Sequence, residues 1–156
     1  KKNQQFSAMR PLNYPTYEVR YKNSENKVQI FDVIRKKFVV VQPEEWVRHN
    51  VIQFLIHDKK YPISLINVEK QLTVNTLKKR YDILVFDPKG NITLLVECKS
   101  PKIAITQPTF DQIARYNMQL NAKFLMVTNG LRHFYCKMDY EKEKYTFLEQ
   151  FPDFSR

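Results

Sequence analysis

The sequence is poor in glycine and has no long apolar run. Only Gly90 and Gly130 are glycines among its 156 residues, so neither a phosphate-binding loop nor a dinucleotide-binding fingerprint can be written in it. No apolar stretch approaches the ~18 residues that cross a bilayer, and the first residues are polar, unlike a signal-peptide core. These absences exclude a nucleotide-driven motor, and we expect a cytoplasmic protein without a membrane span.

The cysteines and histidines form no metal-binding pattern. Cys98 and Cys136 make no CxxC pair, and Cys98 lies inside an apolar strand-like run, where a thiol is usually a small buried hydrophobe. The three histidines lack the spacing of zinc ligands. We therefore expect reduced cysteines and no zinc site.

The chain is strongly basic. It has 26 Lys and Arg against 16 Asp and Glu, which gives a net charge of +10. Basic surfaces attract phosphate groups by Coulomb attraction and counterion release. Because many basic proteins bind no nucleic acid, the charge indicates a polyanionic partner only together with a motif.

Helix and strand patterns alternate along the main part of the chain. Pro43 suits the first position of a helix, and the two glutamates after it suit the positive end of the helix dipole. A second helix is predicted over residues 109–121. Apolar, β-prone runs predict strands at 65–74, 81–86, 92–98, 122–128 and 132–138. This order predicts an α/β fold with three layers, in which helices cover both faces of a mixed sheet.

The chain is expected to have three parts. Residues 1–41 are predicted to form an N-terminal arm and a β-hairpin packed on the core, with strands at 17–21 and 28–33 and a short strand at 38–41. Residues 42–138 would form the main domain. Residues 139–156 are expected to be a C-terminal tail whose charged beginning faces solvent.

Charged residues lie at the ends of the two central predicted strands. Glu97 and Lys99 are two residues apart, so their side chains leave the same face of a strand. If the turn between the strands is centred on residues 88–89, Asp82 opposes Leu95 and lies diagonal to Glu97, about 7–8 Å away between backbones. A bulged register would shift this pairing by one residue.

Two carboxylates and a lysine are a minimal set for hydrolysing a phosphodiester. Two carboxylates can share a hard cation such as Mg²⁺, and a lysine beside it can orient water or stabilise developing negative charge. The same residues also fit a structural ion pair between Asp82 and Lys99. The apolar residues around them favour the site, because unpaired charge is costly in a buried strand.

Together with several other strings, these residues resemble the PD-(D/E)xK nuclease superfamily. They are most similar to the branch at the N-terminus of type I restriction enzyme R subunits. The resemblance covers residues 28–138 and implies a restriction-endonuclease-like α-β-β-β-α-β core, in agreement with the predicted order. The strings that carry it are Pro43-Glu44-Glu45-Trp46-Val47-Arg48, Lys79-Arg80-Tyr81-Asp82, Val96-Glu97-Cys98-Lys99-Ser100-Pro101, Gln112-Ile113-Ala114-Arg115-Tyr116 and Val127-Thr128-Asn129-Gly130.

The resemblance implies a role for each matching strand and helix residue. Asp82 and Glu97 would bind Mg²⁺, or Mn²⁺ in its place, with the backbone carbonyl of Cys98 as a further ligand. Lys99 would assist the attacking water. On the second helix, Gln112 and Tyr116 are one turn apart and would position substrate or Lys99; alternatively, the tyrosine lies in the core and the glutamine on the surface.

The acid on the first helix is less narrowly defined. Glu44 stands four residues before Arg48, which fits the related pattern better than Glu45 does. Either glutamate could instead cap the helix. Glu69 is a weaker candidate and suits a charge pair within the sheet.

The resemblance implies a Mg²⁺-dependent DNA endonuclease that lacks the helicase motor of the R subunits. Its expected partners are DNA, most simply double-stranded, and a larger restriction or repair complex. A homodimer is compatible with cutting both strands. The alternatives are a catalytically silent nucleic-acid-binding module and an interaction domain whose charged cluster is only an ion-pair network. No recognition helix is apparent, so little sequence specificity is expected.

Overall fold

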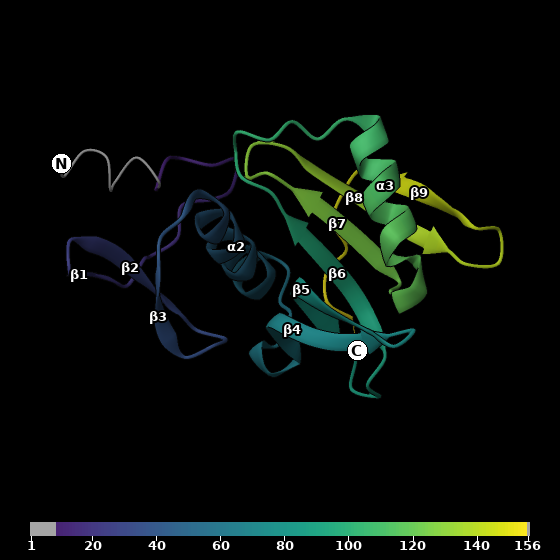
Figure 1. Cartoon of the computed structure of the whole chain (residues 1–156), viewed down its shortest axis with the longest axis horizontal. Helices are drawn as coiled ribbons and strands as arrows, with labels where there is room; N and C mark the ends of the chain where they lie inside the picture. The colour runs from purple at the N-terminus through teal and green to yellow at the C-terminus, as the bar shows by residue number, and fades with distance from the viewer. Residues whose placement is uncertain (1–8, 156) are drawn as a thin grey trace.

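The computed structural model describes residues 9–155, and its fold is mixed α/β with a large proportion of sheet (Figure 1). It contains a three-stranded sheet of order β1-β2-β3 and a six-stranded sheet of order β4-β5-β6-β7-β8-β9. Of the predicted N-terminal arm, residues 1–8 lie outside the described part of the chain. The helix α2 lies between the two sheets.

The N-terminal sheet comprises β1 (Tyr21–Ser24), β2 (Lys27–Asp32) and β3 (Lys37–Val40). The predicted hairpin is present, but its first strand begins at Tyr21, later than predicted, and β3 pairs with β2 to make a three-stranded antiparallel sheet. Both turn residues between β1 and β2 have positive φ, as a tight hairpin turn requires. One face of this sheet packs on Trp46 of α2.

Two helices cover the large sheet. Helix α2 (Pro43–Gln53), extended by a π-helical turn at Phe54–Asp58, packs on the strand residues that include Ile83 and Val96. Helix α3 (Gln107–Asn117), followed by a 3₁₀ turn at Met118–Leu120, packs on the neighbouring strand residues Leu84 and Leu95. Because successive residues of a strand point to opposite faces, α2 and α3 cover opposite faces of the sheet. Within residues 9–155, no helix is both long and apolar enough to cross a bilayer.

The large sheet follows the predicted order of elements. A 3₁₀ turn at Ile63–Leu65 leads into its first strand. Strands β6 and β7 are parallel and the other neighbours are antiparallel. The predicted sequence of helix, three strands, helix and strands is confirmed, although β5 begins four residues earlier than predicted. The strands are β4 (Ile66–Val74), β5 (Leu77–Phe86), β6 (Ile92–Cys98), β7 (Phe124–Thr128), β8 (His133–Asp139) and β9 (Lys144–Leu148).

The predicted register between β5 and β6 is wrong. Leu84, not Asp82, pairs with Leu95, and the register shifts at a bulge between Val85 and Phe86. The loop is longer than predicted because the Asp87 carboxylate accepts hydrogen bonds from backbone N–H groups inside it and so closes residues 87–91 as one turn. The shift moves Asp82 toward the end of β6, where Glu97 lies.

The segment predicted as a C-terminal tail contributes to the fold. Strand β9 pairs with β8 along its length and forms one edge of the large sheet. After it, Phe151 is buried in the core beneath α2 and contacts the rings of Phe54 and Tyr135. Residues 140–143 form the turn between β8 and β9, and the charged residues 141–143 are exposed, as predicted for the beginning of the tail.

Candidate active site

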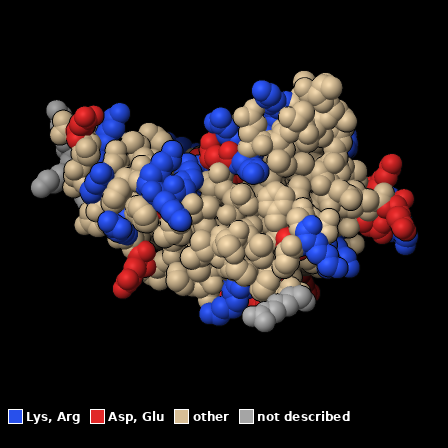
Figure 2. All heavy atoms as spheres, turned by 90° about the horizontal axis from the view of Figure 1, so that it is seen from below, with Lys and Arg blue, Asp and Glu red and all other residues tan. Residues whose placement is uncertain are grey.

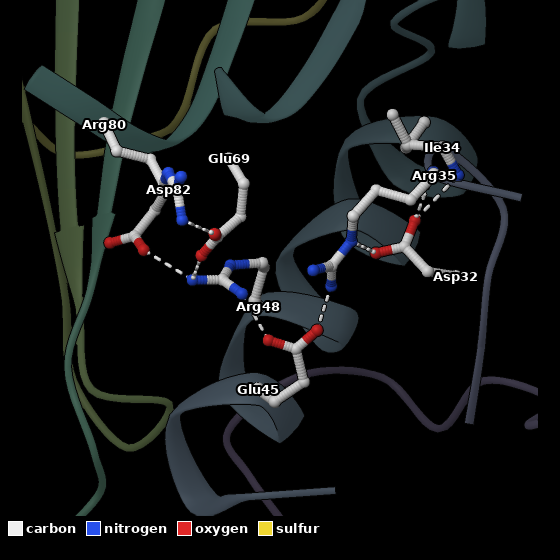
Figure 3. Close-up of polar contacts among 8 residues, drawn as sticks. All are labelled: Asp32, Ile34, Arg35, Glu45, Arg48, Glu69, Arg80 and Asp82. Carbon is white, nitrogen blue, oxygen red and sulfur yellow. Dashed lines mark hydrogen bonds and ion pairs between the residues drawn. The ribbon is translucent and has the colours of Figure 1, made fainter. Parts of the chain in front are cut away.

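Asp82 is held in place from two directions near the end of β6. One carboxylate oxygen accepts a hydrogen bond from the backbone N–H of Cys98 at 2.8 Å. The other accepts from the guanidinium of Arg48 on α2 at 2.7 Å (Figure 3). The side chain of Arg48 is only 6% exposed, so this ion pair lies in the interior between the helix and the sheet. Asp82 is therefore oriented before any ligand arrives.

Arg48 is the centre of a wider set of ion pairs. The same nitrogen that contacts Asp82 lies 2.9 Å from Glu69 of β4, and another nitrogen contacts Glu45. Glu45 also contacts Arg35, which pairs with Asp32 at 2.8 Å, so charges of alternating sign run from the N-terminal sheet to the large sheet (Figure 3). Burial alone would lower the pKa of Arg48, but the bonded carboxylates raise it.

Glu69 has an unusual backbone conformation. Its φ is +57°, which is rare outside glycine and costs free energy in a strand. The flanking residues pair regularly with β5, as Val68 with Ile83 and Lys70 with Tyr81. The strained residue thus lies opposite Asp82, and its carboxylate turns to the same guanidinium.

Glu97 and Lys99 form an ion pair beside Asp82. The Lys99 Nζ is 3.0 Å from a Glu97 carboxylate oxygen, and the two side chains are 33% and 27% exposed, respectively. Partial burial acts to lower the pKa of Lys99, but the bond to Glu97 and the charges of Glu44 and Asp82 raise it. Lys99 therefore stays protonated at neutral pH and can donate hydrogen bonds.

Of the two glutamates at the start of α2, Glu44 is the one coupled to these residues. Partial burial raises the pKa of Glu44, and the negative charge of Asp82 raises it further, while Arg48 and Lys99 act in the opposite direction. Glu45 instead forms ion pairs with Arg35 and Arg48. Glu44, Asp82 and Lys99 thus share one electrostatic environment.

A hollow between β5, β6 and α3 is lined by both acids. Asp82 and Glu97 line it together with Tyr116 of α3 and the basic stretch at residues 78–80. Tyr116 is 58% exposed, and the Nζ of Lys79 lies 3.8 Å from the centroid of its ring. Gln112 is exposed one turn earlier and is not among the described residues that line the hollow. Of the two helix residues, Tyr116 therefore lines the hollow together with Asp82 and Glu97, whereas Gln112 does not.

The oxygen donors at this place suit a hard cation. Within residues 9–155, no three His, Cys, Asp or Glu side chains are grouped so that they alone could hold a metal ion. Mg²⁺ does not need such a cage, because it usually keeps several waters and uses one or two carboxylates. Asp82, Glu97 and a backbone carbonyl such as that of Cys98 therefore fit the group that the sequence implies.

Sequence reasoning missed two residues of this site. Arg48 served only to choose between the glutamates, although an arginine on the apolar face of a helix signals a buried ionic partner. Lys79 carried no signal of its own, because its contact with Tyr116 depends on how α3 crosses the sheet. Glu69 was expected as a sheet charge pair, and it does pair with Arg80 at 3.5 Å, but it also contacts Arg48.

Comparisons with known proteins assign the chain to a family. Residues 43–152 match the family described as type I restriction enzyme R protein N terminus (HSDR_N). Among solved structures, the chain is similar to a fragment of a putative HsdR subunit of a type I restriction enzyme from Vibrio vulnificus YJ016, with a TM-score of 0.47 and 23% identity. That likeness covers 66% of this chain and 22% of the other. No curated protein matches.

The family match includes every element that builds the candidate site. It begins at the first residue of α2, which carries Arg48, and extends past β9. The predicted relation to the R subunits is thereby confirmed. The chain belongs to the type I restriction enzyme R protein N terminus family.

Proposed function

We propose that the chain is a metal-dependent endonuclease that hydrolyses phosphodiester bonds of DNA, with a site of the PD-(D/E)xK kind. The observation that carries this proposal is the placement of Asp82. Its carboxylate is bonded to the backbone N–H of Cys98 at the end of β6, and Asp82 lines the same hollow as Glu97. Lys99, protonated and paired with Glu97, supplies the third group. The sheet with α2 and α3 on its two faces supports the three-layer core that the resemblance implies.

The residues of the chain have separate tasks in this reaction. A bound Mg²⁺ would supply Lewis-acid neutralisation of the phosphoryl oxygens and would lower the pKa of a water molecule. Asp82 and Glu97 would hold the cation. Lys99 would donate hydrogen bonds to the attacking water or to a phosphoryl oxygen, where charge develops in the transition state. Arg48 keeps Asp82 oriented and does not itself reach the hollow.

The basic wall of the hollow suits the substrate. Residues 78–80 contribute two lysines and an arginine next to the two carboxylates. Lys79 is held against the ring of Tyr116, which limits the freedom of its ammonium group. A phosphodiester backbone could thus contact cations on one side of the hollow while its reacting phosphate faces the acids.

Family membership supports a larger assembly. The family is described as the N terminus of type I restriction enzyme R proteins. We infer that the chain acts on double-stranded DNA as part of a restriction complex.

One observation favours the alternative of a silent nucleic-acid-binding module. Both carboxylate oxygens of Asp82 already accept hydrogen bonds, one of them from a buried cation. An ion pair of this kind can substitute for a metal in a fold that has lost turnover. In that case DNA binding would persist in EDTA and no divalent cation would support cleavage.

Cleavage of supercoiled plasmid tests the proposal. With Mg²⁺ or Mn²⁺ the intact protein should nick or linearise the plasmid, and EDTA should abolish this activity. Glu97→Gln and Lys99→Met should each reduce the rate at least about 100-fold, since each removes a group needed in the transition state. Lys102→Met, an exposed lysine three residues further on, is the matched control and should cut normally. Cleavage that survives both site substitutions would contradict the proposal.

A further inference from the structure

The outward face of the N-terminal sheet combines aromatic rings with cations. Phe31 of β2 and Phe38 of β3 are paired across the strands, with ring centroids 5.3 Å apart. The guanidinium of Arg20 lies 4.7 Å and 5.4 Å from these two centroids. The ammonium group of Lys22 lies 4.4 Å from the ring of Phe38. Two cations thus rest on a pair of rings, and we name these four residues the aromatic–cation face.

Strand alternation explains why these residues point away from the molecule. Val28 and Ile30 are buried against Trp46, so the residues between and beside them point to the other side of the sheet. Arg20 and Lys22 are exposed, and both rings are half-buried beneath them. The sheet therefore has one face for the core and one face open to solvent.

This end of the molecule is also strongly basic. Residues 20–40 contain six Lys and Arg against two Asp and Glu, and one of these acids, Asp32, is paired internally with Arg35. Figure 2 shows several Lys and Arg side chains at the left end of the molecule, where β1–β3 lie in Figure 1. A surface with so few acids is complementary to a polyanion.

The chemistry of the aromatic–cation face selects among polyanions. The rings are already covered by cations, so they are not free to stack on the bases of a single strand. The rings instead restrict the rotamers of Arg20 and Lys22, while the N–H groups of both residues can still reach a phosphate. A surface that offers positioned cations but no free aromatic ring suits the sugar–phosphate backbone of a duplex, whose bases are stacked inside the helix.

We infer that the aromatic–cation face is a docking surface for the phosphate backbone of double-stranded DNA, separate from the hollow between β5, β6 and α3. The inference rests on the proposed function, because the docked duplex would be the substrate. The face lies before residue 43, outside the segment that matches the family. The ion pairs from Asp32 through Arg35 and Glu45 to Arg48 start on the opposite, buried face of the same sheet and lead to the site.

Fluorescence anisotropy of a labelled 20-base-pair duplex tests the inference. The titration is done in EDTA, so that binding is measured without cleavage, and it is repeated over a series of NaCl concentrations. Arg20→Gln/Lys22→Gln should bind at least about 10-fold more weakly, and the slope of log Kd against log [NaCl] should fall by roughly 1–2. Lys89→Gln/Lys142→Gln, two exposed lysines in other turns, removes the same charge and should stay within about threefold of the intact protein.

Several results would overturn the inference. Equal losses of DNA affinity in both double variants would mean that only net charge matters. Unchanged binding by Arg20→Gln/Lys22→Gln would show that this face does not bind the duplex. The inference also fails if the intact protein does not bind the duplex but binds phosphatidylserine vesicles through these residues. Thermal unfolding followed by circular dichroism confirms that each variant is folded. Plasmid cleavage that is abolished by Lys99→Met but unaffected by Arg20→Gln/Lys22→Gln would leave the proposed function standing without this surface.

Discussion

At the scale of single residues, Arg48 connects the candidate site to the core. It is buried, its Nε has no hydrogen-bond partner among residues 9–155, and its other nitrogens contact three carboxylates. Removing one member of a buried ion pair leaves an uncompensated charge, which costs several kcal/mol. The orientation of Asp82 thus depends on a residue that does not face the hollow.

Arg48→Met should lower the free energy of unfolding by about 3–5 kcal/mol. The loss arises because Asp82 and Glu69, whose side chains are only 18% and 33% exposed, would lose the buried cation that they share. Urea unfolding followed by circular dichroism measures it. Arg80→Met is the control, since Arg80 pairs with the same Glu69 but is 65% exposed, and it should cost less than about 1 kcal/mol. Similar losses for both variants would contradict this account of Arg48.

His49 should make the stability of the protein depend on pH. Its ring stacks on Trp46, and burial lowers its pKa from 6.5 to about 4, although nearby Asp32 acts to raise it. Between these two values the unfolded chain binds more protons than the folded chain, so stability is fully present above pH 6.5 and falls as the pH is lowered toward 4. The loss amounts to about 3 kcal/mol over that range.

His49→Phe keeps the stacking and removes the titration. Urea unfolding at pH 7.5 and at pH 5 should therefore show a smaller loss of stability for the variant than for the intact protein. The difference between the two proteins isolates His49 from the carboxylates that titrate in the same range. Equal pH dependence would contradict the buried, neutral state of this histidine.

Strand periodicity predicted that Glu97 and Lys99 share a face, and these two residues form an ion pair, but it placed Asp82 opposite Leu95, which is wrong. The partners of these residues could not be predicted in the same way. The contact between Arg48 and Asp82 depends on how α2 is rotated on the sheet, and the left-handed backbone of Glu69 has no marker in its residue type. Local patterns define which residues share a face, whereas contacts between elements require their packing.

At the scale of elements, hydrophobic periodicity and turn residues were sufficient for the order of helices and strands. They were not sufficient for the register of β5 and β6, because the carboxylate of Asp87 lengthens the turn and a bulge at Val85 shifts the pairing. They also missed β9, none of whose residues is fully buried. Edge strands carry a weak signal, since only one side of them is paired.

The C-terminal segment should be required for stability. Phe151 is buried, and Phe151→Ala should cost about 3–5 kcal/mol in urea unfolding. Phe147→Ala removes the same ring from β9, where it is 45% exposed, and should cost less than half as much. If the two substitutions had equal effects, the placement of the segment after β9 in the core would be incorrect.

At the scale of the whole molecule, α2 joins the two sheets. Its Trp46 packs on the N-terminal sheet and donates a hydrogen bond to the backbone carbonyl of Arg10 at 2.8 Å, while Val47 and Val51 face the large sheet. A shared helix and a chain of ion pairs make independent unfolding of the small sheet costly. We expect the two sheets to unfold as one unit.

Trp46 is the only tryptophan and reports directly on this contact. Its fluorescence and the far-ultraviolet circular dichroism should give the same urea midpoint, because one cooperative transition would lose both the contact and the sheets. An earlier midpoint for the fluorescence would show instead that the N-terminal sheet detaches before the large sheet unfolds.

The central claim is that Asp82, in the middle of β5, and Glu97, near the end of β6, form one cation site. Isothermal titration calorimetry with Mn²⁺ tests it without any substrate. We expect one site per chain in the intact protein and binding weakened at least about 10-fold by Asp82→Asn or Glu97→Gln. Glu149→Gln, which alters an exposed acid elsewhere, should bind like the intact protein. No Mn²⁺ binding, or equal binding by all four proteins, would contradict it.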